Sequence, residues 1–89
     1  MSSPVVENSF KKDLKRVLKR GCSREKLEKV VAILMRGEKL PVAYRPHKLT
    51  GEWDGFWECH IESDWLLIYS FIKENLVLVR TGSHADLFE

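Results

Sequence analysis

The chain of 89 residues contains little that could cross-link or anchor it. Its two cysteines, Cys22 and Cys59, form neither a C-x-x-C motif nor a zinc-type spacing, so we expect no disulfide or metal framework. The longest apolar stretch, residues 65–72, is far shorter than the roughly 20 residues that span a bilayer. The first eight residues lack the basic and apolar segments of a secretory signal. We therefore expect a cytoplasmic protein that does not enter a membrane.

Length and composition are typical of one small folded domain covering residues 1–89. The chain is 44% hydrophobic and 31% charged, too apolar for a disordered protein and too polar for a membrane protein. A chain of this size buries roughly 60–65% of the surface that its unfolded form exposes. A second domain is therefore excluded.

The net charge of +2 conceals an uneven distribution. Residues 1–50 carry 13 Lys and Arg against 5 Asp and Glu, whereas residues 51–89 carry 2 against 8. Clustered cations attract polyanions at long range, so the basic half suits a phosphate-rich partner or an acidic protein segment. A solvated helical surface is the alternative interpretation.

Two helices are predicted in the basic half. Apolar residues recur at helical spacing from Phe10 to Leu18, which predicts a helix over residues 9–20 that ends at Gly21. Ser23 can cap a second helix, whose apolar face runs from Leu27 to Leu34 and which Gly37 ends. The lysines of the first helix lie mostly off its apolar face, so its outer surface is densely positive.

Extended segments are predicted after the helices. Residues 40–46 contain two prolines and no helical period, which indicates an extended connector. Aromatic and branched residues predict strands over 56–61, 65–72 and 76–81, separated by turns at 63–64 and 74–75. Short strands are also expected at 49–53 and, on an edge, at 5–6. The predicted fold is α+β, with an N-terminal helical hairpin packed on a C-terminal antiparallel β-sheet.

Strand geometry brings two of the three histidines together. Alternation places Glu58 and His60 on one face of their strand and Cys59 on the other, which argues against a cysteine–histidine catalytic pair. The turn at 63–64 places Asp64 and Trp65 near His60. The last strand should return Arg80 to the level of Trp65, with His84 continuing past the same end of the sheet.

This set of side chains suits RNA cleavage. The reaction needs a base for the 2′-hydroxyl, an acid for the leaving 5′-oxygen and a cation for the phosphorane, and histidines with arginine can supply all three. Trp65, Trp53 or Phe88 could stack on an unpaired base, whereas Trp57 and Tyr69 are expected in the core. A three-histidine zinc site is the rival chemistry, but no histidine pair has the short spacing of zinc motifs.

Three motifs resemble a known family. They are HKLTGEW at residues 47–53, HI followed by DWLLIY between residues 60 and 69, and RTGSHADLF at residues 80–88. Together they resemble the YafQ branch of the RelE/ParE toxin superfamily. The resemblance implies an endoribonuclease of a toxin–antitoxin module that cuts messenger RNA on the ribosome without a metal or other cofactor. It also implies an antitoxin partner that wraps the toxin and silences it, and possible hetero-oligomers of the two.

The resemblance also implies roles for individual residues. His47, His60, Asp64 and His84 match the acid–base set of the family, and Arg80 matches its phosphate-contacting arginine. Trp65 and Phe88 match its flanking aromatic residues. Further RNA contacts are expected from Lys48 and from three lysines of the first helix, Lys11, Lys12 and Lys15. His47 joins the set only through the resemblance, and which histidine is base or acid stays open.

Two other functions remain open at this point. The first is a catalytically inactive module of the same fold that only binds an antitoxin or RNA. The second is an inhibitor of DNA gyrase related to ParE, which the complete histidine set disfavours.

Overall fold

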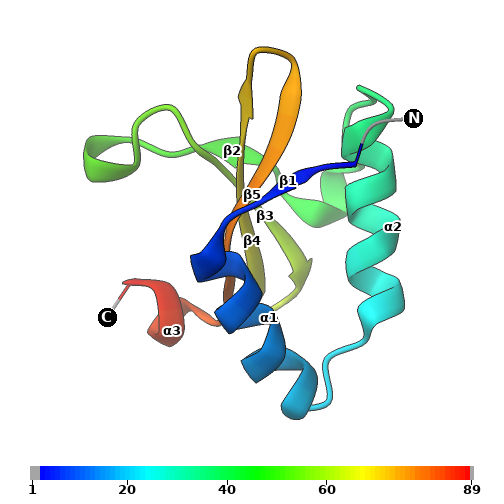
Figure 1. Cartoon of the computed structure of the whole chain (residues 1–89), viewed down its shortest axis with the longest axis vertical. Helices are drawn as coiled ribbons and strands as arrows, with labels where there is room; N and C mark the ends of the chain where they lie inside the picture. Colours follow the sequence, from blue (N-terminus) through cyan, green and yellow to red (C-terminus); the bar gives the residue numbers. More distant parts are fainter. Residues whose placement is uncertain (1–2, 89) are drawn as a thin grey trace.

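Residues 3–88 are described by a computed structural model, and they form a helical hairpin packed on one face of a five-stranded sheet (Figure 1). The hairpin consists of α1 (Asn8–Lys19) and α2 (Arg24–Met35), as predicted. Gly21 adopts a left-handed φ of +96° in the link, and the Ser23 hydroxyl accepts the Lys26 backbone N–H to cap α2. No helix among residues 3–88 is long and apolar enough to cross a membrane.

The sheet has the strand order β1-β5-β4-β3-β2. The strands are β1 (Val5–Val6), β2 (His47–Lys48), β3 (Trp57–Glu62), β4 (Trp65–Ile72) and β5 (Asn75–Gly82). Strands β2 to β5 are antiparallel, but β1 runs parallel to β5, so the predicted antiparallel sheet is mixed at this edge. The long connection from β1 through both helices allows the parallel pairing, which a short turn could not.

Three local predictions need correction. Residues 49–53 are not a strand: β2 lies two residues earlier, and a 3₁₀ turn occupies Gly51–Trp53, where Gly51 has a φ of +68°. The connector contains another 3₁₀ turn at Val42–Tyr44, which ends where Arg45 becomes left-handed. The turn between β4 and β5 is formed by Lys73 and Glu74, because Ile72 pairs directly with Asn75.

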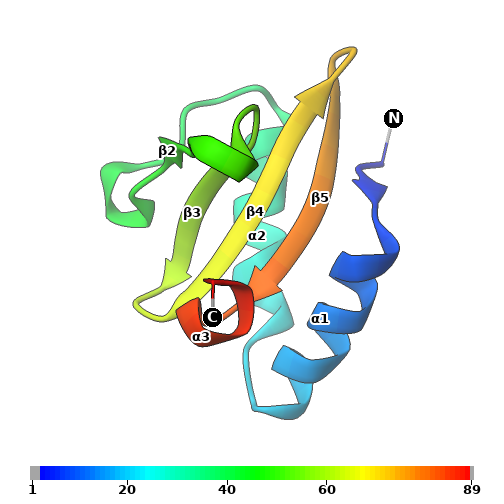
Figure 2. The same cartoon turned by 90° about the vertical axis from the view of Figure 1, so that its left-hand side faces the viewer.

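A short C-terminal helix, α3 (His84–Phe88), was not predicted. α3 lies on the sheet face opposite α2, and α1 runs along the side of the sheet near α3 (Figure 2). Leu87 anchors it to Leu66, Ile68, Val77 and Val79.

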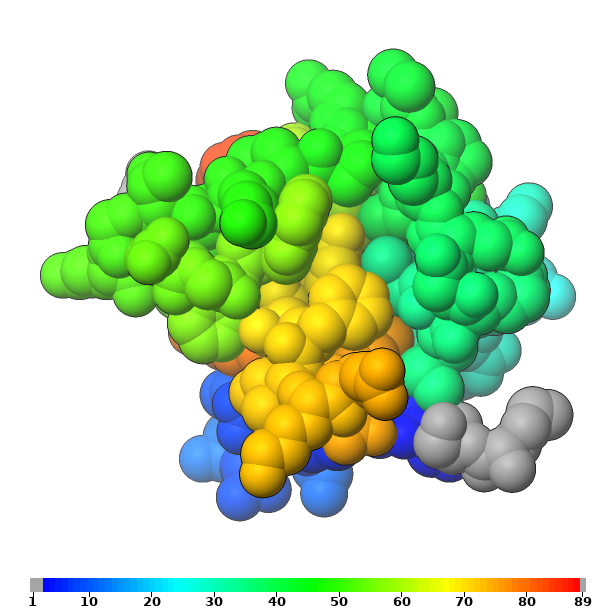
Figure 3. Space-filling model, turned by 90° about the horizontal axis from the view of Figure 1, so that it is seen from above, coloured from blue at the N-terminus to red at the C-terminus, as the bar shows by residue number. Residues whose placement is uncertain are grey.

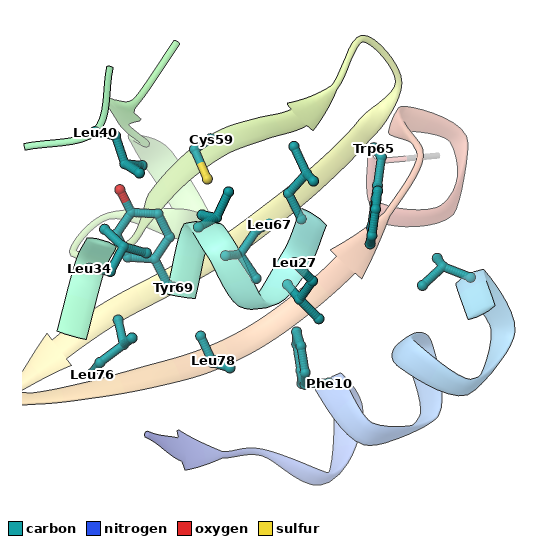
Figure 4. Packing of buried hydrophobic residues seen from close by; sticks show 13 residues of the cluster. Phe10, Leu27, Leu34, Leu40, Cys59, Trp65, Leu67, Tyr69, Leu76 and Leu78 are labelled. Atoms are coloured by element: carbon teal, nitrogen blue, oxygen red, sulfur yellow. The ribbon is translucent and has the colours of Figure 1, made fainter. Parts of the chain in front are cut away.

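The main core fills the space between the sheet and the two helices (Figure 4). Phe10, Val17, Val30 and Leu34 of the helices are buried there, as their spacing predicted. The strands contribute Cys59, Ile61, Trp65, Leu67, Tyr69, Leu76 and Leu78. Removing this much apolar surface from water is the principal stabilising contribution. The opposite face of the sheet carries a second, smaller apolar cluster under α3, and the polar side chains of the candidate site lie beside it.

Candidate active site

Three imidazole rings form a row on the sheet face that α2 does not cover. His47 lies on β2, His60 on β3 and His84 at the start of α3. The ring centroids of His47 and His60 are 6.4 Å apart, and those of His60 and His84 are 5.8 Å apart. The outer two side chains are 50% and 58% exposed, whereas the central His60 is 10% exposed. One reacting group placed over His60 would therefore lie close to all three rings.

Glu58 is buried between two of these rings. It pairs with His47 across β2 and β3, and alternation puts it on the same face as His60. One carboxylate oxygen, Oε1, lies 3.2 Å from Nε2 of His47 and 3.8 Å from Nε2 of His60. The other ring nitrogen of His47, Nδ1, lies 3.1 Å from the carbonyl oxygen of Arg45. Both nitrogens of His47 thus face oxygen atoms.

His60 has a different environment. Its Nδ1 lies 3.3 Å from Nη2 of Arg45 and 3.4 Å from the carbonyl oxygen of Ser63. A guanidinium can only donate hydrogen bonds, so the contact with Arg45 requires an unprotonated Nδ1. The contact with Ser63 requires a protonated one. Each protonation state of Nδ1 therefore has a partner in place.

His84 is held by Asp64 from the turn between β3 and β4. Oδ1 of Asp64 accepts the backbone N–H of His84 at 3.1 Å and lies 3.2 Å from its Nδ1. The backbone hydrogen bond, and then the ring hydrogen bond, hold the pKa of Asp64 below its usual value. With Nδ1 occupied in this way, Nε2 is the nitrogen that His84 presents to a substrate.

Aromatic side chains continue the row beyond His84. The Phe88 ring lies 6.2 Å from that of His84 and 6.2 Å from that of Trp53, which in turn meets Phe56 edge-on. Phe88 is 42% exposed, so part of its ring can receive a planar group.

Comparisons with known proteins identify the family of this chain. Residues 2–89 match the family model described as the bacterial toxin of a type II toxin–antitoxin system, YafQ. The chain belongs to the YafQ toxin family. It is 39% identical over 80 residues to the mRNA interferase toxin YafQ of Escherichia coli K12, a match that covers 89% of this chain and 87% of the relative.

Solved structures of YafQ-type and related toxins share the whole fold. A copper-bound mutant toxin from Helicobacter pylori superposes with a TM-score of 0.93 at 36% identity and covers 99% of this chain and all of its own. The DinJ–YafQ complex of E. coli gives a TM-score of 0.90 at 34% identity, with full coverage of both chains. The RelE-like α+β fold that the motifs implied is therefore confirmed.

Arg80 does not contact the histidines of this YafQ-family chain. It pairs with Ile68 and not with Trp65, and a bulge at Val79 accounts for one residue of this difference in register. Its guanidinium binds the buried carboxylate of Asp13 on α1, with Nη2 3.2 Å from Oδ1. Hydrogen bonding to Asp13 raises the pKa of Arg80 above its usual value.

Trp65 cannot serve as a stacking surface, so that expectation is wrong. The side chain is 3% exposed and lies in the main core (Figure 4). Its indole N–H donates to Oγ1 of Thr81 at 2.8 Å, and the Thr81 hydroxyl donates to the carbonyl oxygen of Leu66. The buried partner makes Trp65 a structural residue of the YafQ-type fold.

The predicted lysines lie in two places. Lys48 pairs with Trp57 and sits over its ring, on the sheet face away from the three imidazoles. The side chains of Lys11, Lys12 and Lys15 are exposed on α1. A cavity of about 400 Å³ on that helix is lined by Lys12, Lys15, Arg16, Lys19 and Arg20.

A separate apolar cleft of about 460 Å³ lies between the end of α2 and β4, and no histidine lines it. Among residues 3–88, no three His, Cys, Asp or Glu side chains are grouped so that they could hold a metal ion. The histidine row, and not a deep pocket, is therefore the candidate site of this YafQ-family toxin.

Sequence reasoning missed two residues of this site. Glu58 carried a signal, because strand alternation placed it beside His60, yet it received no role. Arg45 carried none, since its contact with His60 depends on a left-handed φ of +46° in the connector. Such a conformation is unfavourable for a residue with a side chain, and strained residues of this kind concentrate at functional sites.

Proposed function

We propose that this YafQ-family toxin is an mRNA interferase, an endoribonuclease that cleaves messenger RNA by acid–base catalysis at the row of His47, His60 and His84. One observation carries the proposal: three imidazoles lie side by side, and each has a fixed polar partner. The E. coli relative with 39% identity is named an mRNA interferase.

The reaction that fits is attack of the RNA 2′-hydroxyl on the adjacent phosphorus. A base removes the 2′-hydroxyl proton, the bond from phosphorus to the 5′-oxygen breaks, and an acid protonates that oxygen. The products are a 2′,3′-cyclic phosphate and a free 5′-hydroxyl. Two imidazoles in opposite protonation states can perform both proton transfers without another co-reactant.

The partners of each ring suggest which histidine does what. The carbonyl oxygen of Ser63 can accept a proton on Nδ1 of His60, which leaves Nε2 of the neutral ring able to take a proton and supports His60 as the base. Both ring nitrogens of His47 face acceptors, a carbonyl and the Glu58 carboxylate, which supports His47 as a proton donor. His84, with Asp64 on Nδ1, is the other candidate for the acid. Arg45 also supplies positive charge for the phosphorane next to the base.

RNA recognition is assigned to two surfaces. Phe88 and Trp53 lie beyond His84, where an unpaired base could stack. The exposed lysines of α1, Lys11, Lys12 and Lys15, would attract ribosomal or messenger RNA phosphates, and Arg80 would meet the backbone between the two surfaces. In this division of roles, α1 would bind the ribosome while the histidines cut the messenger RNA.

An antitoxin and the cytoplasm complete the proposal. The E. coli YafQ relative was solved in complex with DinJ. As a toxin of a type II system, this chain pairs with an antitoxin of its own, and translation places its target in the cytoplasm.

The test uses purified toxin and ribosomes carrying a defined messenger RNA. Wild-type protein should generate 2′,3′-cyclic phosphate ends, while His60→Ala and His84→Ala should abolish them and retain the wild-type circular dichroism spectrum. Glu74→Gln, at the far end of the sheet, is the matched control and should cleave normally. Cleavage by both histidine variants at the wild-type rate would contradict the proposal. Binding of ribosomes without cleavage by wild-type protein would favour an inactive binding module.

A further inference from the structure

The helix that carries His84 and Phe88 is too short to be stable alone. α3 has five residues, and an isolated helix of fewer than about 12 residues is marginal in water. Its position must come from contacts with the rest of the protein. Leu87 packs on the sheet and the Phe88 ring lies against that of Trp53, but both residues are at the C-terminal end of α3, so its start needs other contacts.

Asp86 provides several polar contacts at the same helix. Its Oδ2 lies 2.6 Å from Nη1 of Arg20, and its Oδ1 lies 3.1 Å from Nη2, which makes a bidentate ion pair with the end of α1. Oδ2 also accepts the Ser83 backbone N–H, while the Ser83 hydroxyl accepts the Asp86 backbone N–H. This reciprocal arrangement is a capping box that sets where α3 begins. The Asp86 side chain is only 13% exposed.

Gly82 leaves room for this arrangement. It has a φ of +153°, and a Cβ atom there would lie 2.9 Å from both Cβ and Oδ2 of Asp86. The chain therefore approaches the carboxylate closely just before α3 begins. A side chain at residue 82 would push Asp86 away from Arg20.

The charged residues of the two ion pairs come in opposite order along the two segments. On α1 an acidic residue precedes a basic one, and in the C-terminal segment a basic residue precedes an acidic one. Asp13 and Arg20 are seven residues apart and lie on nearly the same face of α1. Asp13 binds Arg80, and Arg20 binds Asp86. A shift of the C-terminal segment along α1 would place like charges together. The two ion pairs therefore fix the register of residues 80–86 on the helix.

We propose that Arg20 and Asp86 are positioning residues for the reaction, because their bidentate ion pair orients α3 so that His84 meets Asp64 and the row of imidazoles. The inference rests on the proposed endoribonuclease function. Neither residue touches the reacting atoms. Arg20 also lines the basic cavity of α1, so the ion pair joins the RNA-attracting surface to the histidine site.

Positioning and simple charge attraction predict opposite results for Asp86. If the charges acted only by attracting RNA, removing the negative charge in Asp86→Asn would strengthen binding and preserve or increase cleavage. If Asp86 positions His84, the same variant should cleave more slowly at saturating RNA. Arg20→Met should slow cleavage in both cases, so Lys19→Met, which removes a neighbouring exposed charge, is its matched control.

The experiment measures single-turnover cleavage of ribosome-bound messenger RNA by the wild-type protein and four variants, with thermal unfolding to confirm that each is folded. We expect Asp86→Asn and Arg20→Met each to lower the saturating rate by about tenfold, the double variant to be no slower than either single variant, and Lys19→Met to change only the half-saturating RNA concentration. A saturating rate for Asp86→Asn equal to or above wild type would overturn the proposal.

A second measurement separates this inference from the proposed function. The imidazole proton signals of His84 in NMR spectra should shift in Asp86→Asn and Arg20→Met, while those of His47 should not. Loss of the nuclear Overhauser contacts between His84 and Asp64 would support positioning even if the wild-type chain cleaved no RNA. Unchanged His84 signals in both variants would overturn the positioning role regardless of activity.

Discussion

Oε1 of Glu58 lies 3.2 Å from Nε2 of His47, and the carboxylate is almost fully buried against that ring. Nδ1 of His47 faces a carbonyl oxygen, so an acceptor lies at each nitrogen of this ring. Glu58 is therefore a buried neighbour of two imidazoles and not a surface charge.

Glu58→Gln should lower the cleavage rate by about 10- to 100-fold, because the amide removes the negative charge that lies beside the His47 and His60 rings. Single-turnover cleavage between pH 5.5 and 8.5 measures the effect. Glu62→Gln on the same strand is the control, since Glu62 pairs with the exposed Lys26 and should leave the rate unchanged. A wild-type rate in Glu58→Gln would remove Glu58 from the site.

Trp65→Phe should reduce stability and leave RNA cleavage unchanged. The substitution removes the indole donor to Thr81 from the core, a loss of about 1–3 kcal/mol in the free energy of unfolding. Urea denaturation and cleavage assays well below the unfolding temperature separate the two quantities. Phe88→Leu should show the reverse pattern, with nearly normal stability and weaker cleavage. If Trp65→Phe lowered the cleavage rate as much as Phe88→Leu does, Trp65 would contribute to substrate binding.

Acid should destabilise the protein in part through Asp86. The hydrogen bonds from Arg20, and then from the Ser83 backbone, hold the pKa of Asp86 well below its unfolded value of about 3.9. A lowered folded-state pKa contributes stability that is present above about pH 4 and is lost as the pH falls toward the folded-state value. Urea unfolding between pH 2.5 and 7 should therefore show a smaller acid loss for Asp86→Asn than for wild type. Asp54→Asn, at an exposed loop position, should follow wild type, and parallel curves for all three proteins would contradict the prediction.

The turn between β4 and β5 should accept a stabilising pair of substitutions. Lys73 and Glu74 both have positive φ, at 49° and 67°, in a two-residue hairpin turn that Asn-Gly fits best. The double variant Lys73→Asn with Glu74→Gly should gain about 1 kcal/mol, or roughly 4–8 °C in unfolding temperature.

Activity should not change in this double variant, because the turn lies at the surface far from α3 (Figure 1, Figure 3). Replacing both residues by Ala removes the same side chains and keeps the strain, so it is the control for calorimetry. A gain as large in the Ala variant would mean that the side chains, and not the backbone angles, limit stability.

The elements that sequence predicted well are those fixed by local periodicity and by turn residues. The bounds of β4 were predicted correctly because its apolar run lies between two turns, and Ser23 marked the start of α2. The parity of β3 placed His60 beside Glu58. The predictions failed by one or two residues at the β4–β5 turn and at β2, where glycine and positive φ, and not hydrophobicity, decide the structure.

Sequence by itself determined the helical hairpin, the strands of the meander and the grouping of His60 with His84, because neighbouring residues set helix period, strand parity and turns. Tertiary structure decided the partner of the buried Trp65 indole, since the bulge at Val79 places Thr81 opposite Leu67, on the same face of the sheet as Trp65. Tertiary structure also brought together residues that are distant in the sequence. Arg20 binds Asp86 across a separation of 66 positions, and Arg80 binds Asp13 across 67. Such pairings leave no periodic pattern in the sequence, because a charge identifies the sign of its partner but not its position.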